Sequence, residues 1–192
     1  MRVIGLAGRA GSGKSAAARY LARRSAVEWI DLDAVAWDTY ALGTAVYERL
    51  LEAFGKEILS ESGEIDRVRL AEAAFASHDN QETLNAIVHP AVSDAVGAII
   101  CEHRQKGTEI LLVEGALLAS SPYVDRTAYD LILWLDATDD LRLERLQAIG
   151  RGDHGKRGNR VIPSGSFISI PADGTIEEIG DCIRRTIEDE LG

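Results

Sequence analysis

The stretch "GRAGSGKS", residues 8–15, decides the fold because it matches the pattern G-x-x-x-x-G-K-[ST] in full. Before it stands "RVIGLA", a short apolar run with β-branched residues, and after it the alanine-rich "KSAAARYLARR". This order predicts a strand, a loop and a helix. In such a loop the backbone N–H groups point at phosphates, and the helix N-terminus adds a favourable field. The sequence therefore predicts a phosphate-binding loop.

The residues of this loop have separable expected roles. Lys14 is expected to reach the β- and γ-phosphates of ATP, and the Ser15 hydroxyl to bind Mg²⁺. The alternative is a flexible glycine turn without a ligand, which the strand–loop–helix context disfavours. The candidate nucleotide-binding residues of the loop are Gly8, Ala10, Gly11, Ser12, Gly13, Lys14 and Ser15.

Composition and charge limit the class of protein. A chain of 192 residues with 46% hydrophobic residues fits one compact globular domain, with room for an inserted subdomain. The formal charge of −10 argues against nucleic-acid binding, so any phosphate-rich ligand must meet a local basic site. Cys101 and Cys182 lack metal-ligand spacing, which is typical of reduced cytoplasmic thiols.

Membrane attachment and assembly are also addressed by the sequence. No run approaches the apolar length of a membrane span, and no signal peptide precedes the first predicted strand. We therefore expect a cytoplasmic protein with no membrane partner. The sequence carries no dimer-specific signal, which favours a monomer.

Beyond the loop, predicted strands alternate with predicted helices. Apolar runs at residues 27–30, 109–114 and 129–136 predict strands. Residues 44–107 predict three or four consecutive helices, with N-terminal caps at Thr44 and Asp66 and a break before Pro90. The alternation predicts an α/β fold with a doubly wound parallel sheet. The expected nucleotide-binding core is residues 1–38, 108–149 and 164–192, including a helix capped at Thr138, and the expected helical insertion is residues 39–107.

Four acidic residues follow the predicted strands, at the edge where parallel sheets bind ligands. Glu114 has the placement of the acid that assists Mg²⁺ in phosphate-loop proteins, whereas Asp136 is expected to shape a turn. Asp31 and Asp33 lie one residue apart, and on extended chain such residues point to opposite faces. We expect Asp31 to hold the turn. Asp33 is expected to face an acceptor hydroxyl as base, or to share in ordering Mg²⁺.

With these motifs in the same order, the chain resembles the dephospho-CoA kinase family over nearly its whole length. The "IDLD" and "LNAIVHP" pieces discriminate, since many kinases share the phosphate loop. The resemblance implies ATP-dependent phosphorylation of the ribose 3′-hydroxyl of dephospho-CoA, with Asp33 as base or orienting group. It also implies that the insertion cradles this acceptor. The matching segments are "VIGLAG", "GSGKS", "IDLDAVA", "AVYERLLEAFGKEIL", "GEIDRVRLAEAAF", "TLNAIVHPAV", "LLVEGALL", "LWLDATDDLRLERL" and "ADGTIEEI".

Two further residues acquire expected roles from the resemblance. His89, before Pro90, is expected to shape the insertion near the acceptor; a capping or packing histidine is the alternative. Glu114 is expected to contact either the acceptor or Mg²⁺, and the sequence leaves that choice open.

The chain departs from the family pattern at three places. Gly8, Arg9 and Ala10 stand where the family usually has Gly-Gly-Ile, and Trp37 stands near a position where Arg is common. The third departure is the lid, residues 150–163, which is helical in the family and glycine-rich here. These departures put acceptor choice in question.

The lid nevertheless supplies a local basic site. Residues 151–160 contain four basic residues, Arg151, Lys156, Arg157 and Arg160, against one acid, Asp153. Arginines recognise phosphates through a bidentate fork, so Arg157 and Arg160 are candidate nucleotide-binding residues. A solvated surface loop is the alternative. The resemblance also suggests that Arg145, on the helix before the lid, faces the nucleotide rather than forming an exposed pair on its own helix.

Two other functions remain compatible with the sequence. One is a phosphate-loop kinase of another small metabolite, such as a nucleoside. The other is a nucleotide-binding module without transferase activity, which the unusual lid motivates. Turnover of ATP with a panel of acceptors separates all three functions.

Overall fold

The structure is a computed structural model, and it describes residues 1–23, 26–116, 118, 124–150 and 165–192. Within it the chain divides into two compact units. The first unit comprises Met1–Asp31 and Ile100–Gly192, and the second comprises Leu32–Ile99. The sequence placed the insertion at residues 39–107, and its role in acceptor binding stays a prediction.

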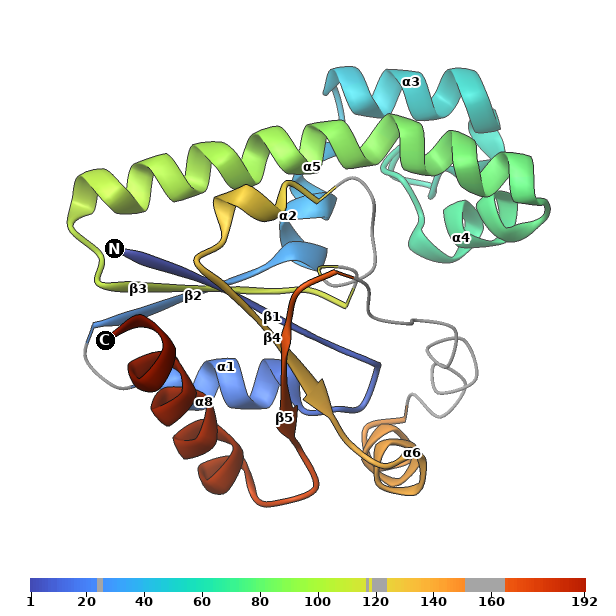
Figure 1. Ribbon diagram of the computed structural model, residues 1–192. Coiled ribbons are helices and arrows are strands. Elements are labelled where there is room, and N and C mark those ends of the chain that lie inside the picture. The colour runs from blue at the N-terminus through green and yellow to red at the C-terminus, as the bar shows by residue number, and fades with distance from the viewer. Residues whose placement is uncertain (24–25, 117, 119–123, 151–164) are drawn as a thin grey trace. The chain divides into compact units, whose positions relative to one another are not determined.

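The first unit is built on a parallel sheet, as the sequence predicted (Figure 1). The strand order is β2-β3-β1-β4-β5, and every pairing is parallel. The strands are β1 (Arg2–Gly8), β2 (Val27–Asp31), β3 (Ile110–Glu114), β4 (Leu131–Asp136) and β5 (Ile168–Pro171). The last strand, β5, was not predicted. It has four residues, ends in proline and lies at the sheet edge, so it lacks the long apolar run of a central strand.

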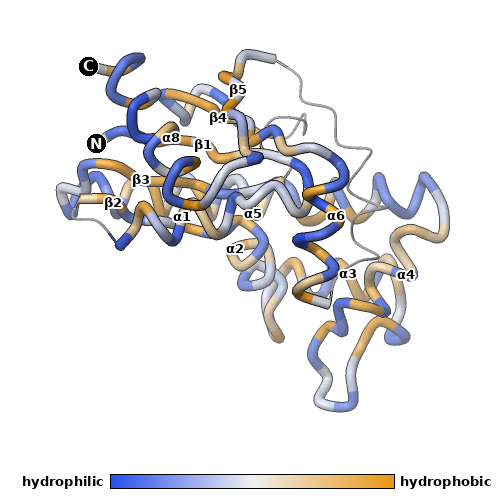
Figure 2. The backbone as a smooth tube through the Cα atoms, turned by 90° about the horizontal axis from the view of Figure 1, so that it is seen from below, coloured by the Kyte–Doolittle hydropathy of each residue, from blue (hydrophilic) through white to orange (hydrophobic). Residues whose placement is uncertain are grey.

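Helices α1 (Lys14–Ala22) and α8 (Ile176–Leu191) lie on the same side of the sheet (Figure 1). Small α1 residues, Ala17 and Ala18, are fully buried, so this helix packs closely on the sheet. Apolar colouring runs along the strands that these helices cover (Figure 2). The main core residues are Ile4, Leu6, Leu112, Leu133 and Leu135 from the strands and Ala17, Ala18, Leu21, Ile179, Ile183 and Ile187 from the helices.

Local sequence explains where α8 begins and how closely it packs. Thr175 and Glu178 form a capping box, in which the Thr175 hydroxyl accepts from the Glu178 N–H and the Glu178 carboxylate accepts from the Thr175 N–H. One turn later, Gly180 is buried against the ring of Tyr20 on α1. A Cβ at position 180 would lie 2.6 Å from Tyr20 Cε1, so glycine sets the approach of the two helices.

The second unit contains helices whose N-terminal caps the sequence predicted. Thr44 accepts from the Tyr47 N–H, and Asp66 accepts from the N–H groups of Val68 and Arg69. The elements are α2 (Leu32–Thr39), α3 (Ala45–Phe54), the 3₁₀ helix η1 (Lys56–Ile58), α4 (Arg67–Phe75) and most of α5 (His78–Lys106). Their core consists of Tyr40, Val46, Leu50, Ile58, Leu70 and Ile87. The remaining elements, η2 (Arg126–Ala128) and α6 (Asp139–Ala148), belong to the first unit.

The predicted break before Pro90 is wrong, because α5 runs through this proline as one helix of 29 residues. A proline inside a helix removes one hydrogen bond and crowds the carbonyl four residues earlier. Packing on both sides offsets this cost: Ile87 is buried before Pro90, and Val96 and Ile100 are buried after it. Tertiary packing therefore overrides the local signal.

Helix α5 is also long and apolar enough to cross a membrane by length and composition alone. The expectation that no apolar segment is long enough to span a membrane is therefore not met when only length and composition are considered. The core helix of a soluble protein passes the same test, and α5 contributes the buried Ile87 to the core of the second unit. One such helix is weak evidence for a membrane span.

The close packing of α1 on α8 leads to a prediction about two helical glycines. Gly180→Ala should destabilise the protein by about 1–3 kcal/mol, because the added methyl group collides with the Tyr20 ring. Gly97→Ala, in α5, should stabilise it by roughly 0.5–1 kcal/mol, since a Cβ there meets no atom within 4 Å. Urea unfolding of both variants measures the difference. Equal effects would show that helix propensity, not the helix–helix approach, governs position 180.

Candidate active site

The loop of residues 8–15 joins the end of the central strand β1 to the start of α1. Gly11 and Gly13 both have positive φ, at 82° and 95°. At position 11 a Cβ would also lie 2.5 Å from the carbonyl oxygen of Arg142 in α6, so the loop and this helix touch through their backbones. Glycine is required here by conformation and by space together.

Two carbonyl groups of the loop accept hydrogen bonds, one from within the loop and one from α6. The Arg9 carbonyl accepts from the Ser12 N–H at 3.1 Å and from Lys14 Nζ at 3.3 Å. The Ala10 carbonyl accepts from Arg142 Nε at 2.9 Å. A loop whose carbonyls are engaged in this way presents its amide groups to an anion, which is how phosphate loops bind.

Two predicted nucleotide-binding side chains of the loop are buried. Lys14 is 8% exposed, and the Ser12 side chain is fully buried next to Gly8. Among the described residues the Ser12 hydroxyl has no hydrogen-bond partner. Direct contact between Ser12 and a nucleotide stays a prediction.

Ser15 and Glu114 meet at the carboxyl edge of the sheet. The Ser15 hydroxyl donates to Glu114 Oε1 at 2.9 Å, and Glu114 is 5% exposed at the end of β3. Asp31, the last residue of β2, pairs with Glu114 in strand register. Hydroxyl and carboxylate oxygens are the ligands that Mg²⁺ prefers. In the described part of the chain no three His, Cys, Asp or Glu residues form a metal site alone, so a cation here would complete its shell from water or phosphate.

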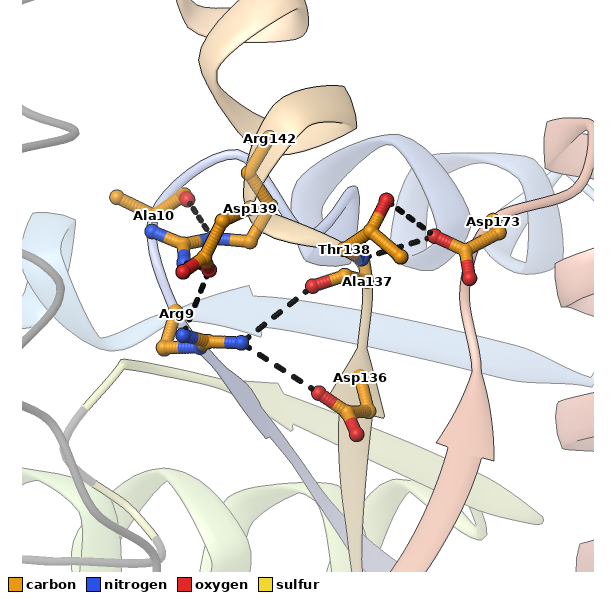
Figure 3. A network of polar contacts seen from close by, with 8 residues as sticks. All are labelled: Arg9, Ala10, Asp136, Ala137, Thr138, Asp139, Arg142 and Asp173. Carbon is orange, nitrogen blue, oxygen red and sulfur yellow. Dashed lines mark hydrogen bonds and ion pairs between the residues drawn. The ribbon is translucent and has the colours of Figure 1, made fainter.

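An ion network connects the loop to α6 (Figure 3). Asp139 Oδ1 accepts from Arg9 Nη1 at 2.8 Å and from Arg142 Nη1 at 2.7 Å. Arg9 also lies 3.7 Å from Asp136 Oδ1. The pKa of Arg142 lies below its usual value, first because the side chain is buried and second because the Arg9 cation is near. Asp139 partly opposes this shift. The sequence predicted that Asp136 shapes a turn, but it missed this network, because Arg9 lies 130 residues before Asp139 in the chain.

The start of α6 differs in detail from the sequence prediction. Thr138 occupies the cap position, but its side chain makes no capping hydrogen bond. Its N–H and hydroxyl instead donate to Asp173 Oδ1, at 2.9 and 3.1 Å (Figure 3). The segment between β5 and α8 therefore supplies the acceptor at this end of α6.

Arg145 lies one turn after Arg142 and contacts two segments. Its guanidinium donates to the carbonyls of Ser12 at 3.3 Å, Ala172 at 3.0 Å and Gly174 at 3.1 Å. The alternative of an exposed pair on its own helix is therefore wrong, because Arg145 bridges the loop and the segment before α8. That it faces the nucleotide stays a prediction.

Asp33 is placed differently from the sequence expectation. Helix α2 begins at Leu32, directly after the last residue of β2, so Asp33 lies in the first turn of a helix rather than on extended chain. The expectation that Asp31 and Asp33 point to opposite faces of an extended chain is therefore wrong. The helix-favouring "LDAVAW" that follows Asp31 accounts for the early start. Asp33 is exposed and belongs to the second unit, whereas Lys14 belongs to the first.

A cation–aromatic cluster of Arg67, Trp37 and Tyr40 lies in the second unit, and Asp33 acts electrostatically on its Tyr40. The Arg67 guanidinium lies 3.4 Å from the centre of the Trp37 ring, and the Trp37 and Tyr40 rings are 4.7 Å apart. Burial raises the pKa of Tyr40 to about 12, with Arg67 lowering it and Asp33 raising it. Arg67 was not predicted from the sequence as a functional residue. The available signal was its place directly after the Asp66 cap in "GEIDRVRL".

Other predicted residues are placed as follows. His89 lies inside α5, not at a helix end, and burial lowers its pKa, which favours the neutral imidazole. Its role near the acceptor stays a prediction. Arg157 and Arg160 lie outside the described residues, as do Arg151 and Lys156.

The arrangement defines a class of protein. A central strand ends in a glycine loop and a helix, and the hydroxyl after the loop lysine bonds an acid on the neighbouring strand. This is the nucleotide site of phosphate-loop kinases and nucleoside triphosphatases.

Comparison with known proteins narrows this class. The model of the dephospho-CoA kinase family matches residues 2–155. The dephospho-CoA kinase of Thermobifida fusca is 35% identical over 148 residues, 77% of this chain and 72% of that protein. The Corynebacterium glutamicum dephospho-CoA kinase is 31% identical over 187 residues, 93% and 94% of the two chains. This chain belongs to the dephospho-CoA kinase family.

Solved structures agree in fold. TT1252 from Thermus thermophilus has a TM-score of 0.78 at 23% identity, covering 100% of this chain and 98% of that one. The Campylobacter jejuni dephospho-CoA kinase has a TM-score of 0.65 at 15% identity, covering 98% and 97%. Shikimate kinase from Aquifex aeolicus reaches 0.53 at 15% identity, covering 97% and 96%. The predicted phosphate-loop kinase fold is confirmed.

The loop geometry leads to a prediction for Lys14. Lys14→Ala should lower turnover by at least about 10²-fold, because the amine that neutralises phosphate charge is lost. The melting temperature should stay close to that of the wild type. Steady-state kinetics and calorimetry check both, with the exposed Lys56→Ala as a matched control. Near-normal turnover in Lys14→Ala would remove this residue from the mechanism.

Proposed function

We propose that this protein transfers the γ-phosphoryl group of ATP to the ribose 3′-hydroxyl of dephospho-CoA, giving coenzyme A and ADP. The hydroxyl oxygen forms a bond to the γ-phosphorus while the bond to the β,γ-bridging oxygen breaks, and the hydroxyl proton passes to a base. The observation that carries the proposal is an intact phosphate loop, with Ser15 bonded to Glu114, in a chain of this family.

The ATP side of the reaction is assigned to the first unit. The loop amides and Lys14 bind the phosphates, so that positioning and charge neutralisation provide most of the catalysis. Ser15 would hold Mg²⁺, with Glu114 beside it, because their oxygens already converge at 2.9 Å. When bound, Mg²⁺ neutralises charge on the β- and γ-phosphate oxygens.

The acceptor side is assigned to the second unit. Asp33 is exposed in the first turn of α2, where a carboxylate can accept the hydroxyl proton. Arg67 supplies a cation that, like Asp33, acts on Tyr40, and a cation suits the phosphates of dephospho-CoA on a chain of net charge −10. Trp37 holds the plane of that guanidinium. His89 is proposed to shape the same unit.

Arg157 and Arg160, in the lid, are proposed to close over the nucleotide. Arg145, on the helix before the lid, is proposed to face the nucleotide. The enzyme is further proposed to act as a cytoplasmic monomer, without a nucleic-acid or membrane partner. A nucleoside kinase and a nucleotide-binding module are the competing functions. Family membership favours neither of them.

Acceptor choice is tested by ADP release with dephospho-CoA, adenosine and uridine at equal concentration. We expect dephospho-CoA to give a kcat/KM at least about 10²-fold above both nucleosides, because only it supplies phosphates to the basic residues. Turnover of a nucleoside in preference would favour the metabolite-kinase alternative. ATP binding without turnover of any acceptor would favour the binding module.

The two acids of "IDLD" should behave differently. Asp33→Asn should lower kcat by at least about 10²-fold with ATP affinity retained, because the amide cannot take the proton. Asp31 stands at the residue before α2, where a cap lies, so Asp31→Asn should keep turnover and lower stability by at most about 1 kcal/mol, because asparagine caps as well as aspartate but lacks its charge. Turnover and melting temperature of both variants decide the assignment. An inactive Asp31→Asn beside an active Asp33→Asn would invert it.

A further inference from the structure

We propose that Arg9 and Arg142, joined through Asp139, are positioning residues that hold the phosphate loop in its ATP-binding shape. They set the affinity for ATP rather than the rate of phosphoryl transfer. The inference rests on the proposed function, in that the loop binds ATP. It gives a functional role to Arg9, which stands at a variable position of the loop motif, and to Asp139 and Arg142, which lie outside the motif.

One carboxylate oxygen joins the loop to α6. Asp139 Oδ1 accepts from a guanidinium of the loop and from a guanidinium of its own helix, at 2.8 and 2.7 Å (Figure 3). Asp139 lies in the first turn of α6, so its backbone is fixed by the helix. Its carboxylate therefore ties the loop side chain of Arg9 to a rigid element.

Asp139 also determines where Arg142 points. Arg142 is 1% exposed, and its guanidinium is a rigid plane. Because Nη1 is bonded to Asp139, Nε is directed at the Ala10 carbonyl at 2.9 Å. Removing the carboxylate would take the Asp139 ion pair away from a buried cation, and the hold of Arg142 on the Ala10 carbonyl would weaken.

The backbone of Arg9 transmits the same constraint to Lys14. Its carbonyl accepts from the Ser12 N–H and from Lys14 Nζ, so the position of residue 9 bears on the amine expected to meet the phosphates. The Arg9 side chain is anchored to Asp139, to Asp136 and to the Ala137 carbonyl at 3.4 Å.

The network acts through geometry rather than through added positive charge. Asp136, Arg9, Asp139 and Arg142 alternate in sign, so the two arginines are neutralised within the network. Asp139 is 56% exposed, and solvent screens its long-range field. Backbone contact between Gly11 and Arg142 means that the loop cannot shift without α6.

The test compares Asp139→Asn with Asp140→Asn, its neighbour in the same first turn of α6. Asp140 is exposed and carries the same charge in the same turn, so it serves as a control for the helix dipole. We expect Asp139→Asn to raise the Kd for ATP about 10-fold, as for loss of a charged hydrogen bond. At saturating ATP, kcat should stay within about 2-fold of the wild type, and Asp140→Asn should bind like the wild type.

Calorimetric titration with ATP alone, well below the melting temperature, separates positioning from stability. A lowered melting temperature with unchanged Kd would overturn the proposal, and so would a lowered kcat with unchanged Kd. Arg9→Ala leaves the Arg142–Asp139 pair intact, so it provides a second variant if Asp139→Asn does not fold; its expected rise in Kd is about 3-fold.

A double-mutant cycle completes the test. Because Arg9 acts through Asp139, the effects of Arg9→Ala and Asp139→Asn on the Kd should be smaller together than their product. Independent effects would overturn the shared mechanism. ATP binding is measured without an acceptor, so failure of dephospho-CoA as substrate leaves this proposal standing. A wild-type chain that does not bind ATP would overturn the proposed function and this proposal together.

Discussion

Parallel pairing of β1 with both β3 and β4 is the constraint on which the rest of the structure depends. It brings the carboxyl ends of three strands to one edge of the sheet, at Gly8, Glu114 and Asp136. The bond from Ser15 to Glu114 and the contact of Arg9 with Asp136 both follow from that alignment. The Gly11 contact with α6 fixes the remaining side of the loop. The loop is thus shaped by its neighbours as much as by its own glycines.

The sequence predicted the elements whose signals are local. The phosphate loop, the Thr44 and Asp66 caps and the apolar runs of β3 and β4 each depend on neighbouring residues, and the structure confirms them. The helix break before Pro90 was wrongly predicted because packing overrode the local signal of the proline. Strand β5 was not predicted because an edge strand of four residues gives little signal. Asp33 was misplaced because nothing before Leu32 marks the change from strand to helix.

The candidate site likewise contains residues that a local sequence signal marks and residues that no local signal marks. Lys14, Ser15 and Glu114 could be found because a motif and a strand end mark them. Arg142 could not, since its partners are three residues away in Asp139 and 132 residues away in Ala10. A buried arginine on a helix rich in charged residues gives no periodic signal. Only the fold reveals that this side chain contacts the phosphate loop.

Assignment of ATP and acceptor to different packing units has a consequence for how residues act. Residues on the ATP side, such as Lys14 and Asp139, share a sheet and a helix whose contacts are fixed within the first unit. Asp33, Trp37 and Arg67 form a cluster of their own within the second unit. On the proposed assignment, we expect a change in one cluster to alter the binding of one substrate more than that of the other. The rate of transfer depends on both, since in-line attack requires the hydroxyl and the γ-phosphate to be aligned at the same moment.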